Sequence, residues 1–233
     1  MRPSARGLGV SSALLSWLEQ RAGAIAEDLL PEAVLTLTHW AKDADAAPVL
    51  ENAGFVPIRH FLQMRIDLST GDLPRPSWPG GLELRCFSPG RDEAELFAAF
   101  RAAFAEHSGD AEVDEAEWWN ENRDAANAGF DPTLWFVASD GTTFAGFSIC
   151  REREDGGWIS LLGVRPHRRG RGLGEALLTH SLDVLRTREL GHAALNVDVD
   201  NTTGALRLYE KVGMNPVPAF TIWSKRIGKE RVL

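Results

Sequence analysis

The sequence predicts an α/β protein built on a mixed β-sheet. Apolar runs of strand length alternate with stretches of helical periodicity along most of the 233 residues. Glycine turns at 140–141 and 155–157 separate three consecutive strand patterns, which is typical of antiparallel hairpins. A glycine-rich loop at 170–174 then joins the last of these strands to a helix.

Composition and charge limit the classes of function. The chain is 44% hydrophobic and 25% charged, which supplies a sizeable core and excludes a disordered or collagen-like protein. The formal net charge of −8 makes duplex nucleic acid a poor partner. No uncharged apolar run approaches the roughly 18 residues of a membrane span. Only Cys86 and Cys150 occur, so we expect a reducing, cytoplasmic setting and no metal cluster.

The chain divides into three parts in this interpretation. Residues 67–81 contain three prolines and three glycines and are typical of a linker. Residues 82–233 form the longer part, with both strand and helix patterns throughout. Residues 1–66 contain only a loop, helix, strand, helix and strand, so we expect a partial unit.

Two short motifs occur twice, which indicates an internal repeat. Arg-Gly-Leu-Gly stands at 6–9 and again at 171–174, before a helical pattern each time. Gly54 and Gly213 each follow a helical pattern, and Phe61 and Phe220 are separated by the same interval as these two glycines. The order of elements is the same in both places, so a diverged duplication is the prediction.

Each element of the longer part follows from its local pattern. Alternating or continuous apolar runs predict the strands, and apolar residues three or four positions apart predict the helices. Asp140-Gly141 and the glycines at 156–157 end strands, and Gly213 closes the last helix. The expected strands are 82–87, 134–139, 144–151, 158–164, 193–199 and 217–224, and the expected helices are about 92–106, 114–128, 174–189 and 203–212.

The loop at 165–174 carries the clearest chemical signal. Alternating glycines allow backbone N–H groups to converge without obstruction by a Cβ atom, and the helix that follows adds partial positive charge. Four arginines, at 165, 168, 169 and 171, add full charges. The loop therefore predicts a pyrophosphate cradle, with a solvated basic turn as the alternative. It is not a Walker loop, because no Gly-Lys-Ser/Thr follows, and it lacks the glycine spacing of the dinucleotide fingerprint.

Two separated motifs carry a family resemblance. Arg169-x-x-Gly172-x-Gly174 follows a strand ending in Leu-Gly-Val, and Asn201-x-x-x-Ala205-x-x-x-Tyr209-x-x-x-Gly213 comes later in the chain. Together they resemble the GNAT superfamily of N-acetyltransferases over essentially all of 82–233. The tandem arrangement, with sequences at 104–107 and 130–132, resembles the mycothiol synthases and their actinobacterial relatives.

The resemblance implies a GNAT fold, which is a mixed, mostly antiparallel central sheet flanked by helices. It also implies acetyl-CoA as co-substrate without a metal, and a small-molecule amine as acceptor. A strand end, the loop, the Asn and the helix after it would hold acetyl-CoA. These cofactor-binding residues are Leu162, Gly163, Val164, Arg169, Gly170, Arg171, Gly172, Leu173, Gly174, Glu175, Asn201 and Ala205.

Tyr209 matches the residue that protonates the leaving thiolate in the family. Its ordinary pKa near 10 suits an acid that starts neutral and gives a proton to a thiolate. Tyr209 is the only tyrosine of the chain, against 11 Phe and 8 Trp, which favours a functional phenol. A tyrosine with its ring in the core is the alternative.

The general base is less defined. Family members often carry Glu or Asp at the position of Ser160, and a serine needs help to act as a base. Asp198 on the next strand and Glu152 and Glu154 on the neighbouring hairpin could act through water, or be structural or solvated. His107 is a further candidate, with a surface role as the alternative. We assign Tyr209, Ser160 and Asp198 to catalysis, and His107, Trp118 and Glu152 to acceptor binding.

The predicted helices before residue 124 are acidic. Residues 92–124 hold 11 Asp and Glu against two arginines, a local charge of −9. In the family fold these helices overlie the acceptor side, where an acidic wall would concentrate a cationic amine. Solvated outer helix faces are the alternative. Trp118 and Trp119 are adjacent and cannot face the core equally, so one of them is a candidate to line the acceptor cleft.

The first part lacks the family's functional side chains. The interval between the repeats places Leu50 opposite Tyr209 and Lys42 opposite Asn201, and Ser4 stands where Arg169 would correspond. We therefore interpret 1–66 as a degenerate partial GNAT-like repeat that packs rather than catalyses. Missing strands encoded upstream of Met1 are equally compatible with the sequence.

The resulting functional prediction is an acyl-CoA-dependent N-acyltransferase that uses acetyl-CoA and a primary amine in a ternary complex. One alternative is a non-catalytic CoA-binding GNAT-like module. Another is an enzyme like mycothiol synthase, acting on an aminosugar–inositol–cysteine acceptor. A homodimer is a further expectation, whereas nucleic acid and membranes are not expected partners.

Overall fold

The computed structural model describes most of the chain. His107 and Asn201 lie outside the described residues, as do Ser4 and Lys42, so the predictions made for them have no structural counterpart. The described ranges are 7–29, 35–41, 44–69, 73–105, 113–123, 130–199 and 204–227.

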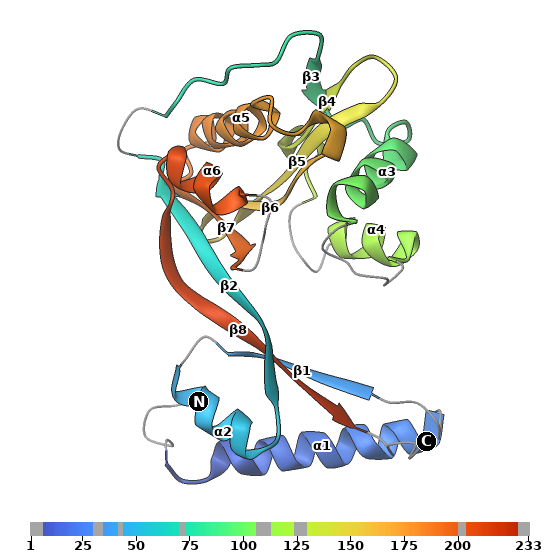
Figure 1. Ribbon diagram of the computed structural model, residues 1–233, viewed down its shortest axis with the longest axis vertical. Helices are drawn as coiled ribbons and strands as arrows, with labels where there is room; N and C mark the ends of the chain where they lie inside the picture. The colour runs from blue at the N-terminus through green and yellow to red at the C-terminus, as the bar shows by residue number, and fades with distance from the viewer. Residues whose placement is uncertain are drawn as a thin grey trace. The chain divides into compact units, whose positions relative to one another are not determined.

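Eight strands form one hydrogen-bonded sheet in the order β1-β8-β2-β7-β6-β5-β4-β3 (Figure 1). Strands β3 to β6 pair antiparallel, whereas β6 and β7 are parallel. The sheet is therefore mixed and mostly antiparallel, as predicted. The strands are β1 (Leu35–Ala41), β2 (Val56–Asp67), β3 (Glu83–Cys86), β4 (Trp135–Ser139), β5 (Phe144–Arg153), β6 (Gly156–Val164), β7 (His192–Asp198) and β8 (Asn215–Ile227).

The helices accompany these strands in the predicted order. The helix predicted over 114–128 is described from residue 115 to 123, and the one predicted from 203 begins at 205. The helices are α1 (Val10–Leu29), α2 (Ala47–Asn52), α3 (Glu93–Phe104), α4 (Glu115–Arg123), α5 (Leu173–Thr187) and α6 (Ala205–Lys211), with short 3₁₀ turns at Ala44–Ala46, Pro132–Leu134 and Pro166–Arg168.

The chain forms two compact units. Unit 1 comprises residues 1–62, 198–200 and 218–233, and unit 2 comprises 63–197 and 201–217. Strands β2 and β8 contribute residues to both. The predicted parts 1–66, 67–81 and 82–233 are defined by repeated sequence motifs, whereas the two units are defined by contacts. The predicted boundaries therefore remain a prediction. Residues 218–227 of β8 belong to unit 1, although the sequence prediction places them in the second repeat.

Unit 2 contains a sheet with helices on both faces. A Cβ atom at Gly146 on β5 would touch Leu173 and Leu177 of α5, and one at Gly163 on β6 would touch Ala103 of α3 and Phe147 of β5. Since successive residues of a strand point to opposite faces, α5 and α3 cover opposite sides of the sheet. The layered α/β arrangement follows from the apolar alternation of these strands.

The described part of the predicted linker packs along α5. The Trp78 ring meets His180 of α5 edge-on, with ring centroids 5.8 Å apart. Upstream of it, the Leu68 N–H donates to the Gly191 carbonyl at 3.0 Å. Residues 73–81 are therefore part of the packing of unit 2, a role that their proline and glycine content does not reveal.

Unit 1 contains a strand from the C-terminal end of the chain at its centre. Strand β8 lies between β1 and β2, and pairs antiparallel with β1 from Leu35↔Ile227 to Ala41↔Thr221. Trp223 of β8 joins the buried core that contains Leu15, Leu50 and Phe55. The segment 1–66 thus depends on a strand that it does not encode.

Candidate functional site

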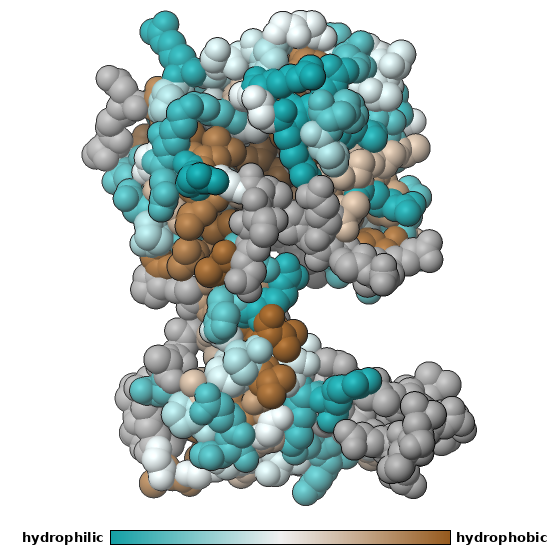
Figure 2. All heavy atoms as spheres, in the orientation of Figure 1, coloured by the Kyte–Doolittle hydropathy of each residue, from teal (hydrophilic) through white to brown (hydrophobic). Residues whose placement is uncertain are grey.

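A pocket of about 260 Å³ lies in unit 2 where β6 ends and α5 begins. In Figure 2, drawn in the orientation of Figure 1, apolar residues show in a hollow near α5 and α6, surrounded by polar ones. The pocket is lined by Ala103, Phe104, Leu162, Gly163, Val164, Arg168, Arg169, Gly170, Gly172, Leu173, Gly174, Glu175, Gly204, Ala205, Leu208 and Tyr209.

The loop before α5 has the backbone that an anion cradle needs. Gly170 and Gly172 adopt left-handed conformations, with φ of 72° and 82°, which L-residues with side chains rarely adopt. A Cβ atom at either position would meet no atom within 4 Å, so both glycines face open space. Gly172 caps α5, whose first N–H groups have no partner inside the helix. The loop and helix start therefore fit a pyrophosphate group.

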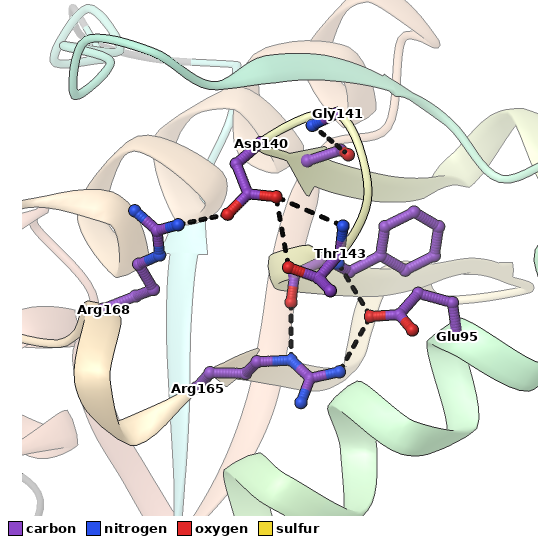
Figure 3. Close-up of polar contacts among 8 residues, drawn as sticks. Glu95, Asp140, Gly141, Thr143, Arg165 and Arg168 are labelled. Carbon is purple, nitrogen blue, oxygen red and sulfur yellow. Dashed lines mark hydrogen bonds and ion pairs between the residues drawn. The ribbon is translucent and has the colours of Figure 1, made fainter.

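Two of the four loop arginines hold the loop in place. Arg165 pairs with Glu95 of α3 at 2.8 Å, and its Nε donates to the Phe144 carbonyl at 2.8 Å. The Phe144 N–H in turn donates to Glu95 at 2.9 Å. Arg168 forms an ion pair with Asp140 in the turn between β4 and β5 (Figure 3). These contacts, which we call the loop clamp, fasten the loop to α3 and to that turn.

Asp140 is itself well held within the clamp. Its carboxylate accepts hydrogen bonds from the Thr143 N–H at 3.2 Å and from the Thr143 hydroxyl at 3.1 Å (Figure 3). The hydrogen bond from the Thr143 backbone, with the nearby charge of Arg168, lowers the pKa of Asp140. The carboxylate is thus charged at neutral pH and available to Arg168.

Arg169 also bonds to the protein. Its guanidinium donates to the Val164 carbonyl at the end of β6 (3.2 Å) and to the Ala103 carbonyl of α3 (2.9 Å). Arg171 is exposed and does not line the pocket. The predicted positive charge of the loop is therefore largely used to shape it, although Arg168 and Arg169 also line the pocket.

Tyr209 lines the same pocket from α6. Its side chain is only 7% exposed, and this burial raises its pKa to about 12. The phenol therefore remains protonated at neutral pH. A neutral, buried hydroxyl at the pocket wall can act as a proton donor.

Ser160 occupies an irregular position of β6. Ile149 pairs with Leu161 and Cys150 with Ile159, so Ser160 is the extra residue of a β-bulge. It is half-buried and does not line the pocket. A bulge redirects the strand at this point, but the structure does not bring Ser160 to the pocket wall.

Two of the three carboxylates considered as bases, Asp198 and Glu152, make ion pairs elsewhere. Asp198 is held by Arg59, with both Nε and a terminal nitrogen of the guanidinium at 2.7 Å. Glu152 pairs with Arg188 at 2.7 Å, and Arg188 also pairs with Asp131 at 2.9 Å. Neither Asp198 nor Glu152 lines the pocket.

Trp118 lies in an aromatic cluster between α3 and α4. It is buried, and its ring packs against Phe100 and Phe97 with centroid distances of 4.9 and 5.6 Å. Trp119 lies under the guanidinium of Arg123, 4.1 Å from its ring centroid. Neither tryptophan lines the pocket, so the described structure gives both a packing role.

Some described pocket-lining residues were absent from the predicted set. Arg168 belongs to the basic loop, and Gly204 and Leu208 lie between the fixed positions of the second motif. These three residues could therefore have been predicted from the sequence. Ala103 and Phe104 come from α3, far before the loop in the sequence, and no local pattern connects them to it.

The described residues contain no group of three or more His, Cys, Asp or Glu side chains that could hold a metal ion. Among the described helices, none has the length and apolar character to cross a membrane.

Comparisons with known proteins agree with this geometry. The Acetyltransferase (GNAT) family model matches residues 94–214. A mycothiol acetyltransferase of Thermobispora bispora is 34% identical over 96% of this chain and 72% of its own length. The chain spans about two thirds of the length of further curated relatives.

Solved structures show the same fold. A GCN5-related N-acetyltransferase from Sphaerobacter thermophilus is 30% identical with a TM-score of 0.83, over 100% of this chain and 73% of that protein. A tandem GNAT protein from the clavulanic acid biosynthesis pathway has a TM-score of 0.71 at 17% identity, over 99% of this chain and 74% of that one, which supports the fold alone. With its two motifs, its mixed sheet and its glycine-lined pocket, the chain belongs to the GNAT family of acetyltransferases.

Proposed function

We propose that this chain transfers an acetyl group from acetyl-CoA to a primary amine within a ternary complex. One observation carries the proposal. A single pocket combines a glycine cradle at the start of α5 with a buried, protonated Tyr209. The cradle suits the pyrophosphate of CoA, and the phenol suits a reaction in which a thiolate leaves.

The chain's own residues would divide the work as follows. N–H groups of the loop at 169–174 bind the pyrophosphate, and the end of β6 at 162–164 borders the pantetheine arm. Asn201 and Ala205 match the family residues that flank that arm. Acetyl-CoA supplies an acyl thioester that the neutral amine attacks. Tyr209 gives the proton of its Oη to the departing sulfur.

We propose two candidates, Ser160 and Asp198, for the base that receives the amine proton. Ser160, at the bulge of β6, matches the family position but is a weak base by itself. Asp198 is a stronger base whose carboxylate already pairs with Arg59. Substitution of each with activity measured across pH would identify the group, because loss of the true base lowers the rate most where that base is ionised.

The acceptor is proposed only as a class. The relative from Thermobispora bispora is named a mycothiol acetyltransferase, so an aminosugar–inositol–cysteine compound is a second candidate acceptor beside simple amines. Glu115, Glu117 and Glu121 are exposed on α4, which supports the approach of a cationic amine. Glu152 and His107 remain proposed acceptor contacts, whereas the buried Trp118 packs against Phe97 and Phe100 of α3.

The deciding experiment is a panel of amines, including the aminosugar–inositol–cysteine compound, incubated with acetyl-CoA while free CoA thiol is measured. We expect amine-dependent thiol release above hydrolysis in the absence of amine. CoA binding without turnover of any amine would contradict the proposal.

Three further proposals accompany this one. The predicted limits at 1–66, 67–81 and 82–233 would mark a degenerate repeat, a linker and a catalytic repeat, supported by the matching motifs. A cytoplasmic location is supported by Cys86 and Cys150, which are both free thiols. Sedimentation velocity tests the proposed homodimer.

A further inference from the structure

A buried arginine of β5 has no acidic partner within the part of the chain that the structure describes. Arg151 is 9% exposed, and its guanidinium donates to Asn122 of α4, to the carbonyl at 3.1 Å and to Oδ1 at 3.2 Å. Its Nε is buried and finds no hydrogen-bond acceptor among the described residues. Burying a charge without a counter-charge costs free energy of folding. A buried, unpaired arginine is therefore a candidate to bind an anionic ligand.

A second arginine lies on the same face of the strand. Arg153 is two residues further along β5, so both side chains point to one side of the sheet. Its guanidinium carbon is 3.9 Å from the ring centroid of Trp158, the residue paired with Arg151. Burial and the charge of Arg153 lower the pKa of Arg151. Burial also lowers the pKa of Arg153, and the negative charge of Asp155 in the turn offsets part of that decrease. Arg153 thus lies over the ring of the tryptophan that pairs with Arg151 across the two strands.

This arginine pair and the pocket share one face of the sheet. Phe147 has the same strand parity as Arg151 and pairs with Gly163, which lines the pocket. Arg151 is four residues from Phe147 along β5, roughly 13 Å at about 3.3 Å per residue, and their partners on β6 are Trp158 and the pocket residue Gly163. The bulge at Ser160 lies between them. Because Phe147 and Ile149 of β5 are fully buried on this face, a molecule that reaches the arginines from the pocket would follow β6, where Trp158 and Leu161 are half-buried.

We propose that Arg151 and Arg153 bind an anionic group, a carboxylate or a phosphate, of the amine acceptor. The acceptor would be an extended molecule with its reacting amine at the pocket and its anion about 13 Å away along β6. A guanidinium fork suits either oxyanion, and its desolvation strengthens the attraction. The position of the amine rests on the proposed function, but the anion site does not.

The competing explanation is purely structural. The Asn122 carbonyl belongs to the last turn of α4, where a cation favours the helix end. That role accounts for one hydrogen bond of Arg151. It does not account for the buried Nε or for a second arginine beside Trp158, and it predicts no preference for any ligand.

A binding experiment separates the two explanations. The probes are ω-amino carboxylates of increasing chain length, the matching ω-aminoalkyl phosphates, and n-alkylamines of equal length, titrated by calorimetry into the full chain with CoA present. We expect wild type to bind the best anionic probe about tenfold more tightly than its matched alkylamine. The preferred anion identifies the acceptor as a carboxylate or a phosphate.

Three variants complete the test. Arg153→Gln changes an exposed side chain and Arg151→Gln a buried one, and each should lose most of the tenfold advantage without weakening alkylamine binding. The matched control, Arg186→Gln, removes an arginine that pairs with Asp183 on α5 and should keep the advantage. Because Arg151→Gln could disturb α4, the exposed Arg153→Gln alone suffices to judge the proposal.

The outcomes are distinct for the two proposals. Equal binding of anionic and neutral probes by wild type, or an advantage that Arg153→Gln retains, would overturn the anion site. Acetylation of the same probes is measured in parallel. Anion-selective binding without acetylation of any probe would count against the proposed function while supporting the anion site.

Discussion

The two Arg-Gly-Leu-Gly segments, at 6–9 and 171–174, both stand directly before or at the start of a helix, and the second of them contributes Gly172, Leu173 and Gly174 to the pocket. Gly7 and Gly172 occupy equivalent positions and have nearly the same left-handed backbone, with φ of 76° and 82°. Helix α1 begins at Val10 and α5 at Leu173. The motif therefore sets a left-handed backbone at its first glycine but not the helix start, because Gly9 is also left-handed (φ 74°) and precedes α1, whereas Gly174 already lies within α5.

The surroundings of the two helices differ. Helix α5 follows β6 and packs on the sheet of unit 2, so that Leu173 and Leu177 are completely or almost completely buried. Helix α1 packs on β1 and leaves Leu14, Trp17 and Leu18 57%, 60% and 45% exposed. The second segment lines a pocket, and there a strand leads into the loop and the loop clamp fastens it. The turn sequence alone does not make a binding site.

The ends of α2 and α6 give a second matched pair. The Phe55 N–H donates to the Leu50 carbonyl at 2.9 Å, and the Met214 N–H donates to the Tyr209 carbonyl at 3.0 Å. Gly54 and Gly213 both have positive φ, 81° and 97°. The backbones are equivalent, but Leu50 packs in the core of unit 1 whereas Tyr209 lines the pocket. The repeats thus share a scaffold and differ in chemistry.

The largest expected effect concerns the completeness of the first repeat. Residues 1–66 encode β1 and β2, but in unit 1 the strand between them is β8. Without β8, β1 and β2 lose their shared neighbour and Trp223 leaves the core. We expect the isolated fragment 1–66 to give an undispersed amide NMR spectrum. A dispersed spectrum from a monomeric fragment would mean that the repeat closes its own core.

The next effect compares the two turns directly. Gly172→Val places a β-branched side chain at a left-handed position and in the space of the proposed phosphates. We expect CoA affinity, measured by calorimetry, to fall by roughly 100-fold. Gly7→Val introduces the same strain at the equivalent turn and should leave CoA affinity unchanged. Equal loss in both variants, or in neither, would remove the distinction between the turns.

The third effect compares the two helix ends. Tyr209→Phe keeps the ring and removes the proposed acid, so CoA affinity should hold while kcat falls by roughly 100-fold. Because burial raises the pKa of Tyr209 to about 12, the wild-type acid should stay protonated, and active, well above pH 10. Leu50→Val, at the equivalent position, should lower the melting temperature without lowering kcat of the folded protein. An unchanged kcat in Tyr209→Phe would leave Tyr209 as a packing residue.

Local patterns predicted much of the fold. Alternating apolar residues and glycine turns gave strands β3 to β7, and the loop and helix of the cradle lay where the glycines indicated. Helix ends were less exact, because caps and tertiary contacts decide them. The Tyr209 position on the pocket wall also agreed with its motif spacing.

Long-range contacts were beyond the reach of sequence reasoning. The four loop arginines suggested ligand charge, yet Arg165 pairs with Glu95, which lies far earlier in the chain. Strand β8 completes unit 1 by pairing with a strand near the other end of the sequence, as between Ile222 and Trp40. Such partners depend on the assembled sheet, and no local periodicity records them.

The smallest expected effect tests whether the clamp makes the second turn a site. Glu95→Gln keeps an oxygen that can accept from the Phe144 N–H but loses the charge that pairs with Arg165. Simple electrostatics predicts tighter binding of the polyanionic CoA when a nearby carboxylate is neutralised. If instead the clamp orders the loop, CoA affinity should fall, by about tenfold, with kcat at saturation little changed. Asp183→Asn, which changes the charge of α5 equally but lies away from the loop, is the control and should not weaken binding. Calorimetry distinguishes the two cases by the direction of the change in CoA affinity. Equal or tighter CoA binding in Glu95→Gln would show that the loop arginines attract the ligand by their charge. The difference between the two segments would then be due to β6 alone.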